Sequence, residues 1–249
     1  MAKQASIVVS YDGTHNEDDA VALGRLFAQA GAEISLTYVR HSAEVEAGRE
    51  ALAEHEAEEL LRRGAALLGG HEVGRHVVTD RSTPEGLRRL AERVNANAVV
   101  FCSDSHTAKG HIAIGNSARR LIEGGPLAVA IAPAGFATQD ARLQLIGVGG
   151  DREDPSARVT AESLAAAVGA SVSALADESA DLLVIGSREE VEAGRVGLSA
   201  AAENLIEGLA RCPVIVMPRG VELSFADAPS LSSAPNGSGG EGGGIPVAA

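Results

Sequence analysis

Three short apolar segments recur in the same order in the two halves of this 249-residue chain, and each ends in Gly, Asp, Ser or Pro. The matched pairs are residues 7–13 with 145–151, 98–103 with 181–187, and 126–133 with 212–218. Continuous rather than alternating hydrophobicity is typical of parallel strands that are buried on both faces. Recurrence in a fixed order indicates a duplicated unit. The sequence therefore predicts an α/β protein with a doubly wound parallel sheet in two repeats, the second of them truncated.

The two repeats are predicted to be unequal in length. We expect a complete domain over residues 1–135, with strands at 6–10, 33–39, 71–79, 97–102 and 127–132 and helices between them. A shortened domain over 141–219 lacks the long second helix and at least one strand, and residues 170–174 serve in it only as a connection. Residues 220–249 contain no Lys or Arg and include a Gly/Ser-rich run, so we predict a disordered tail there.

Charge and composition exclude several classes of partner. The net charge of −13 repels phosphate backbones and anionic lipids, so we expect no nucleic-acid partner and no membrane partner. No apolar run approaches the roughly 18 residues of a membrane span, and we expect no signal peptide from the N-terminal residues. Cys102 and Cys212 each lie beside a predicted buried strand, which favours reduced core thiols over a disulfide. These features predict a soluble, cytoplasmic protein.

Several motifs give the first half a resemblance to a known family. They are Val9-Ser10-Tyr11-Asp12-Gly13-Thr14, the strand Leu36–Val39, Val77–Thr79 followed by Pro84-Glu85, Val99–Phe101, and Gly115-Asn116-Ser117. Over nearly its whole length the first half resembles the universal stress protein family, and the second half looks like a contracted copy. The resemblance implies a Rossmann-like parallel sheet, of the adenine nucleotide alpha hydrolase-like type, whose last strand pairs with that of a second copy. We therefore expect residues 127–132 and 214–217 to pair, either between the two halves or in a homodimer.

The phosphate loop of the family is present only in part. In the ATP-binding branch it reads Gly, two residues, Gly, nine residues, then Gly-Ser or Gly-Thr, and glycines let backbone N–H groups approach the phosphates. The matching first-half positions are Cys102, Ser105, Gly115 and Asn116, with Asp104 adding a negative charge and Lys109 a positive one. The second half has Gly186, Glu189, Ser199 and Ala200. We expect no triphosphate to bind there in the manner of the family.

A degenerate adenine-nucleotide site, for ATP or AMP, is the candidate site of the first half. Its predicted members are Asp12, Val39, Ser103, Ser105, Lys109, Gly115, Asn116 and Ser117. By resemblance Asp12 meets ribose or a metal, the Val39 backbone meets adenine, and Gly115, Asn116 and Ser117 meet phosphate. The alternative is structural, because Asp12-Gly13 suits a strand-to-helix turn and Gly115-Asn116 a helix cap.

The polar residues at the strand ends could also form a metal site or an acid/base site. His15, His106 and His111 could meet the carboxylates of Asp12, Asp18 and Asp19 at the strand ends, but a solvated polar rim explains them more simply, and we predict no metal. No Gly-x-Ser-x-Gly motif follows a strand. The expected function is a non-catalytic regulatory or binding role in the stress response. The alternatives are a slow nucleotide hydrolase using Asp12, His15 or His106, and a structural scaffold with no ligand.

Overall fold

The computed structural model describes residues 3–14, 16–41, 47–69, 73–139, 141–149, 154–174 and 179–225. In this part of the chain the central feature is a sheet with the strand order β4-β3-β2-β5-β6-β10-β9-β7-β8. Its strands are β2 (Ser6–Ser10), β3 (Glu33–Arg40), β4 (Gly74–Thr79), β5 (Ala98–Cys102), β6 (Ala128–Ala132), β7 (Leu145–Gly149), β8 (Ser171–Ala174), β9 (Leu182–Ile185) and β10 (Val214–Val216). All neighbours in this sheet are parallel except β6 and β10. The predicted mixed α/β fold with a mostly parallel sheet is confirmed.

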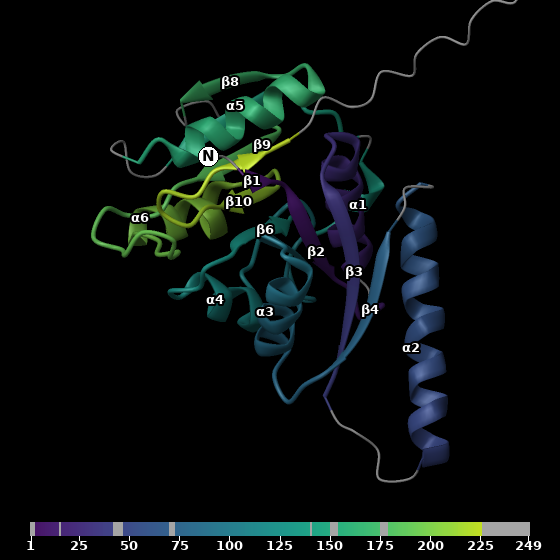
Figure 1. The fold of residues 1–249 in the computed structure, drawn as a ribbon. Coiled ribbons are helices and arrows are strands. Elements are labelled where there is room, and N and C mark those ends of the chain that lie inside the picture. Colours follow the sequence, from purple (N-terminus) through teal and green to yellow (C-terminus); the bar gives the residue numbers. More distant parts are fainter. Residues whose placement is uncertain are drawn as a thin grey trace, which may run out of the picture.

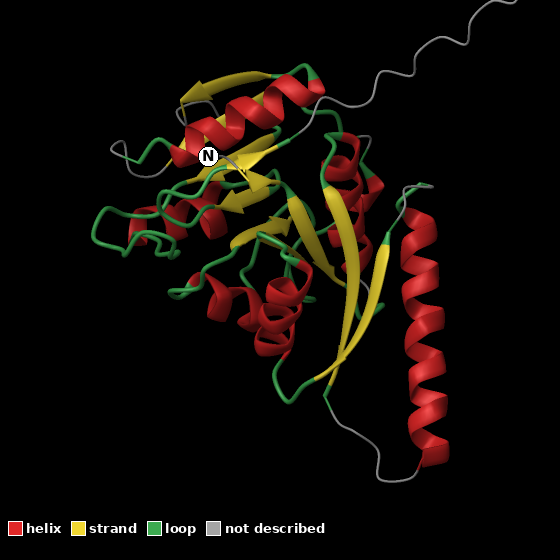
Figure 2. Cartoon of the chain, viewed as in Figure 1, coloured by secondary structure: helices red, strands yellow, loops and turns green. Residues whose placement is uncertain are grey.

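Helices cover both faces of the sheet (Figures 1 and 2). The helices are α1 (Glu17–Gln29), α2 (Ala47–Leu67), α3 (Thr83–Val94), α4 (Asn116–Ile122), α5 (Ser156–Val168) and α6 (Ala200–Asn204), with the short turns η1 (Phe136–Thr138) and η2 (Leu205–Leu209). Side chains of α1 and α5 share one buried cluster with the sheet, and those of α3, α4 and α6 share another. Strands covered on both faces need the continuous hydrophobicity that the sequence shows.

The two halves meet at an antiparallel strand pair. Val214 lies opposite Ile131, and Val216 lies opposite Val129. Each of these strands is also paired on its other edge, β6 with β5 and β10 with β9, so the junction lies inside one continuous sheet. The second half joins the sheet of the first instead of forming one of its own.

Two predicted boundaries in the second half are wrong. Residues 170–174 are not merely a connection, because Ser171–Ala174 forms strand β8 at the sheet edge, paired with β7. The predicted tail does not begin at residue 220, because β11 (Leu223–Ser224) pairs with β1 (Lys3–Gln4). Phe225 is buried, with its ring 5.9 Å from that of Phe27. The alternating apolar residues Val221, Leu223 and Phe225 are the signal that marks this last strand. The rest of the predicted tail, 226–249, lies outside the described residues.

Several contacts of the first half recur in the second. The Ser103 hydroxyl donates to the carbonyl of Ala132 at 2.8 Å, and the Ser187 hydroxyl donates to that of Met217 at 2.7 Å. The N–H of Gly110 donates to Ala134 O at 2.7 Å, and that of Gly194 donates to Arg219 O at 2.8 Å. These contacts agree with a duplicated unit, and the two-repeat arrangement stays a prediction.

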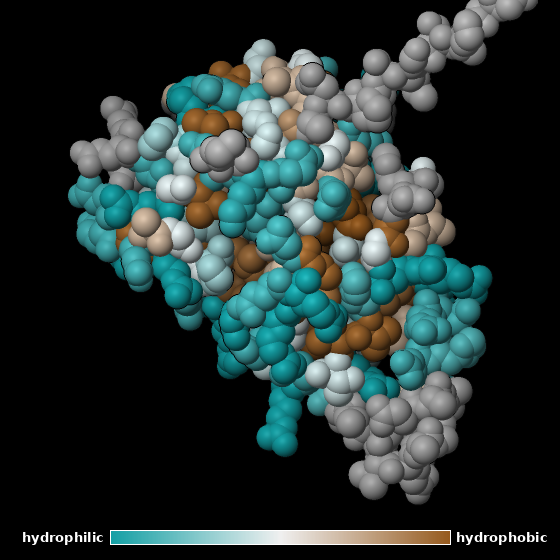
Figure 3. Space-filling view, in the orientation of Figure 1, coloured by the Kyte–Doolittle hydropathy of each residue, from teal (hydrophilic) through white to brown (hydrophobic). Residues whose placement is uncertain are grey.

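The surface has a hydrophilic character in the view of Figure 3, with hydrophobic residues visible near its centre. This agrees with the net charge of −13. Among the helices of the described residues, none has both the length and the apolarity to cross a bilayer.

Candidate functional site

A pocket of about 300 Å³ opens at the carboxyl ends of β2 and β3. Its described lining consists of Ser10, Tyr11, Asp12 and Thr14 after β2, Tyr38, Val39 and His41 at the end of β3, and Thr83 at the start of α3. In an open parallel sheet this edge is where ligands bind. Two of the predicted site residues, Asp12 and Val39, thus line one pocket.

The loop between β2 and α1 is shaped by two carboxyl groups. Asp12 Oδ1 accepts the N–H of Thr14 at 2.8 Å, and Gly13 adopts a left-handed φ of 77°. The Glu17 carboxyl accepts the N–H of Asp12 and, at 3.3 Å, that of Gly13. Glycine suits position 13 because a side chain there would be strained at this φ and would meet Leu60 of α2. The loop leaves the Asp12 side chain exposed at the pocket.

Glu17 is a buried acid behind this loop. Burial, followed by the charge of Asp12, raises the pKa of the Glu17 carboxyl from 4.5 to about 8. Burial also raises the pKa of the Tyr11 hydroxyl, with further contributions from Asp18 and Glu17. Acidic groups are therefore concentrated where β2 ends, and Glu17 itself is protonated at neutral pH.

The end of β5 shares this negative environment. Burial raises the pKa of the Cys102 thiol to about 12, and the charges of Glu17, Asp12 and Asp19 add to the effect. The side-chain amide of Asn16 donates to the carbonyl of Asp104 at 3.1 Å and so ties the loop after β5 to the loop after β2. Asn16 precedes the first residue of α1, and its side chain makes this tertiary contact and no capping hydrogen bond.

The backbone of Val39 faces the pocket. The carbonyl of Thr37 accepts the N–H of Tyr11 at 2.8 Å on the β2 side, and the carbonyl of Arg40 accepts the N–H of Asp80 at 2.9 Å on the β4 side. Backbone groups of alternate strand residues point to the same side, so those of Val39 point towards β2. Because β2 ends at Ser10, the N–H and C=O of Val39 face the space beyond that strand.

The other six predicted site residues are not among the described residues that line this pocket. Ser103 is buried, and its hydroxyl donates to main-chain carbonyls, that of Ala132 at 2.8 Å and that of His111 at 3.3 Å. Ser105 and Asn116 are exposed. The side chain of Lys109 lies against Gly135, where an added Cβ would stand 2.8 Å from Lys109 Cγ.

Gly115 caps α4, and Ser117 lies one residue beyond its start. Close to this cap the second half supplies a carboxylate. Glu207 Oε1 accepts the N–H of Ile114 at 3.2 Å and lies 2.9 Å from the guanidinium of Arg119. By resemblance to the family, the loop after β5 would bind phosphate. One of its backbone N–H groups, that of Ile114, is already bonded to an acidic side chain.

Sequence reasoning missed a paired contact behind the site. The buried Asp19 accepts the N–H of Gly135 at 2.7 Å and that of Ala137 at 2.6 Å. In the second half Asp154 accepts the N–H of Gly220 at 3.1 Å. Both glycines have a left-handed φ and both follow a strand in a Pro-x-Gly sequence, which is the signal that could have revealed the contact.

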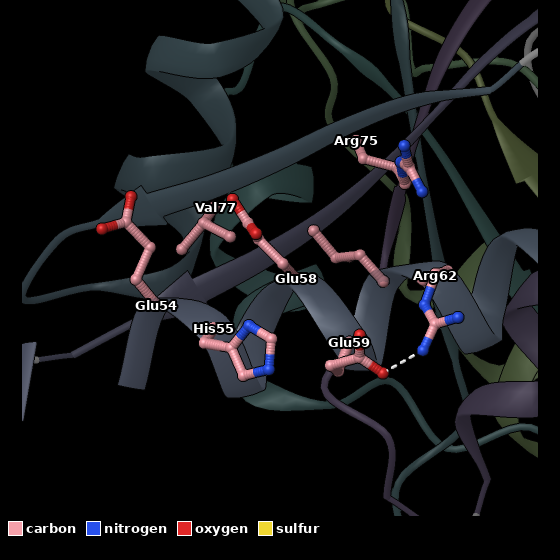
Figure 4. Close-up of a pocket in the computed structure, with 8 residues that line it drawn as sticks. Glu54, His55, Glu58, Glu59, Arg62, Arg75 and Val77 are labelled. Carbon is pink, nitrogen blue, oxygen red and sulfur yellow. Dashed lines mark hydrogen bonds and ion pairs between the residues drawn. The ribbon is translucent and has the colours of Figure 1, made fainter. Parts of the chain in front are cut away.

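A second pocket, of about 490 Å³, lies between α2 and β4 (Figure 4). Its described lining comprises Glu54, His55, Glu58, Glu59, Leu61, Arg62, Arg75 and Val77, and Glu59 forms an ion pair with Arg62. Arg75 lies near the amino end of β4, away from the edge where parallel sheets bind ligands. Within the described residues, which exclude His15, no group of three His, Cys, Asp or Glu side chains is arranged to hold a metal ion.

Comparison with known proteins identifies relatives of one kind. The sequence model of the Universal stress protein family matches residues 5–133. A universal stress protein of Mycobacterium bovis is 33% identical over 110 residues, which are 44% of this chain and 38% of that protein. A protein of the same name from Mycobacterium tuberculosis gives the same values. The chain thus spans well under half the length of these curated relatives.

Among solved structures, a universal stress protein from Archaeoglobus fulgidus is similar over 86% of this chain and 98% of its own, with a TM-score of 0.57. A protein of unknown function from Pseudomonas aeruginosa also gives a TM-score of 0.57, over 87% of this chain and 93% of its own. Their identities of 16% and 14% make these likenesses of fold.

Proposed function

The chain belongs to the universal stress protein family, and from this premise we propose that it is a non-catalytic regulatory binding protein of the stress response. Its ligand is an adenine nucleotide or a part of one, held in a degenerate site in the first half. The observation that carries the proposal is the pocket at the carboxyl ends of β2 and β3, which brings Asp12 together with Val39. Its volume of about 300 Å³ lies at the lower end of the roughly 300–1,000 Å³ typical of ligand pockets.

The proposed binding mode uses the backbone of Val39 and the side chain of Asp12. A strand backbone that presents one N–H and one C=O to the pocket can pair with the ring nitrogen and the amino group of adenine. The carboxylate of Asp12 accepts hydrogen bonds from ribose hydroxyls, as acidic residues do at the corresponding edge of other nucleotide-binding sheets. Tyr38 and Thr83 supply side walls.

The proposed mode of action is a population shift without turnover. The loop at Ile114 contacts Glu207 of the second half, and the N–H of Gly124 donates to the carbonyl of Val196 at 3.0 Å. Asn16 ties the loop after β2 to the loop after β5, so a ligand that orders the first loop acts on the second, where Ile114 contacts Glu207. The association of the halves through β6 and β10 is the partnership on which this regulation depends.

Isothermal titration of the full chain with ATP, ADP, AMP and adenosine tests the proposal. We expect heat with at least one of them, and binding at least about tenfold weaker for the guanine counterparts, because guanine reverses the donor and acceptor that face Val39. Asp12→Ala is expected to abolish the binding. Asp18→Ala is the matched control, since Asp18 is exposed in the same region but is not among the described pocket residues.

Three outcomes contradict the proposal. Absence of heat with every adenine ligand favours a scaffold without a ligand. Equal affinity for adenine and guanine ligands would show that the Val39 backbone does not recognise the base. Steady phosphate release from ATP with Mg²⁺, lost in Asp12→Asn, favours the slow hydrolase instead.

A further inference from the structure

The loops at the carboxyl ends of β2 and β5 have backbone donors that are already occupied by carboxyl groups of this chain. The acceptors and their N–H partners are Glu17 with Asp12 and Gly13, Asp12 with Thr14, Asp104 with His106, and Glu207 with Ile114. The acceptors come from two loops, from α1 and from η2 of the second half. The same kind of contact thus arises independently at several places around one edge of the sheet.

Backbone N–H groups at this edge are the usual means by which α/β proteins hold phosphate. A phosphate group that used these particular N–H groups would have to displace a carboxyl group of the chain. Displacement would leave Glu17 buried without its hydrogen bonds, which is costly because Glu17 is only 8% exposed. The occupied donors therefore favour a ligand without phosphate.

The charges around the pocket also disfavour a ligand that carries phosphate. Asp12 is exposed at the pocket, and none of the described residues that line it is Lys or Arg. Lys109, the one cation of the predicted phosphate loop, lies with its aliphatic stem against Gly135. The charges of Asp12 and Asp19 act as far as Cys102 at the end of β5, whereas the buried Glu17 carboxyl holds its proton at pH 7.

From these contacts we propose that the pocket at Asp12 and Val39 takes an uncharged adenine nucleoside and discriminates against its phosphorylated forms. This inference rests on the proposed function, since it assigns the chemical class of the ligand of that same site. Val39 reads the base and Asp12 accepts the ribose hydroxyls, as proposed above for the nucleotide. Backbone donors of the loops after β2 and β5, which a phosphate would need, are held by carboxyl groups of the chain.

Parallel titrations of the full chain with adenosine, AMP and ATP at pH 7 and low salt test the inference. Adenosine is expected to bind at least about tenfold more tightly than AMP, and ATP most weakly, because repulsion grows with ligand charge. Raising the salt concentration should narrow the difference between adenosine and AMP, because salt screens exposed charges. AMP or ATP binding as tightly as adenosine, or more tightly, overturns the inference and leaves the proposed function intact. Absence of binding by all three ligands contradicts the proposed function itself.

Two matched variants distinguish repulsion of AMP by charges near the pocket from repulsion by the net charge of the whole protein. Asp104→Asn removes one charge at the loop and keeps the side-chain oxygen that accepts the His106 N–H. It is expected to raise the affinity for AMP by about two- to fivefold and to leave that for adenosine unchanged. Glu162→Gln removes the same charge from the exposed face of α5 and should change neither affinity. Equal effects of both variants on AMP would contradict the inference.

Discussion

Replacing Asp19 with alanine is expected to lower the free energy of unfolding by about 3–5 kcal/mol, since two hydrogen bonds to a charged acceptor are lost and two donors are left unpaired. Asp19 is only 4% exposed. Its two carboxylate oxygens accept the N–H of Gly135 at 2.7 Å and that of Ala137 at 2.6 Å. The side chain therefore fixes the turn after β6 against α1.

Urea unfolding followed by circular dichroism measures this loss. Asp18→Ala is the matched control, because Asp18 is exposed on the same helical turn and its carboxylate accepts a long hydrogen bond, of 3.5 Å, from the Tyr11 hydroxyl. We expect the control to change stability by less than about 1 kcal/mol. Asp19→Asn keeps one acceptor oxygen, so its loss of stability should lie between the losses of Asp19→Ala and Asp18→Ala. An Asp19→Ala variant as stable as the control would show that the contact does not hold the turn.

Glu17→Gln is expected to stabilise the protein at pH 8 and to remove much of the pH dependence of its stability. The pKa of Glu17 lies near 4.5 in the unfolded chain and about 8 in the folded one. Between these values the folded state holds a proton that the unfolded state has lost, so stability falls as pH rises through the window. A shift of this size corresponds to roughly 5 kcal/mol once Glu17 is fully ionised. Glutamine has the same shape, keeps an acceptor for the N–H groups of Asp12 and Gly13, and cannot ionise.

The titratable groups that face Glu17 are Asp12 in the loop, Tyr11 at the end of β2 and Cys102 at the end of β5. Unfolding at intervals from pH 5 to pH 8.5 compares the wild type with the variant. The wild type should lose stability relative to Glu17→Gln across this range, by about 3 kcal/mol or more at its upper end. Glu162→Gln, at an exposed site on α5, should follow the wild type. Parallel curves for wild type and Glu17→Gln would mean that Glu17 is ionised in the folded protein at neutral pH.

The sheet could be predicted from the sequence because a strand that is buried on both faces needs a continuous run of apolar residues. Val8, Val99 and Val129 are fully buried, and each lies in a continuous apolar run that ends at a turn residue. The strands at the junction of the halves, β6 and β10, could be located for the same reason. Strand β8 was missed because Ser171 and Ser173 give it the polarity of a loop, which an edge strand tolerates.

The meeting of Asp12 and Val39 at one pocket could be predicted because both residues lie at strand ends, and the carboxyl ends of parallel strands share one edge of the sheet. Glu17 and Asp19 look in the sequence like ordinary acids in the first turn of a helix, which the helix dipole alone would explain. Their actual partners depend on tertiary structure, and Asp19 reaches a residue 116 positions away. The Glu207 contact with Ile114 spans 93 positions and joins the two halves, so no local pattern could have predicted it.

The most direct test of a ligand site at the ends of β2 and β3 is the backbone amide signal of Val39, followed by NMR as adenosine is added to the full chain. The Val39 N–H faces the open pocket, so we predict that it shifts on binding and exchanges more slowly with solvent, together with the signals of Asp12 and Thr14. If adenosine binds while these signals stay unchanged and those of the second half move, the site has been placed in the wrong part of the molecule.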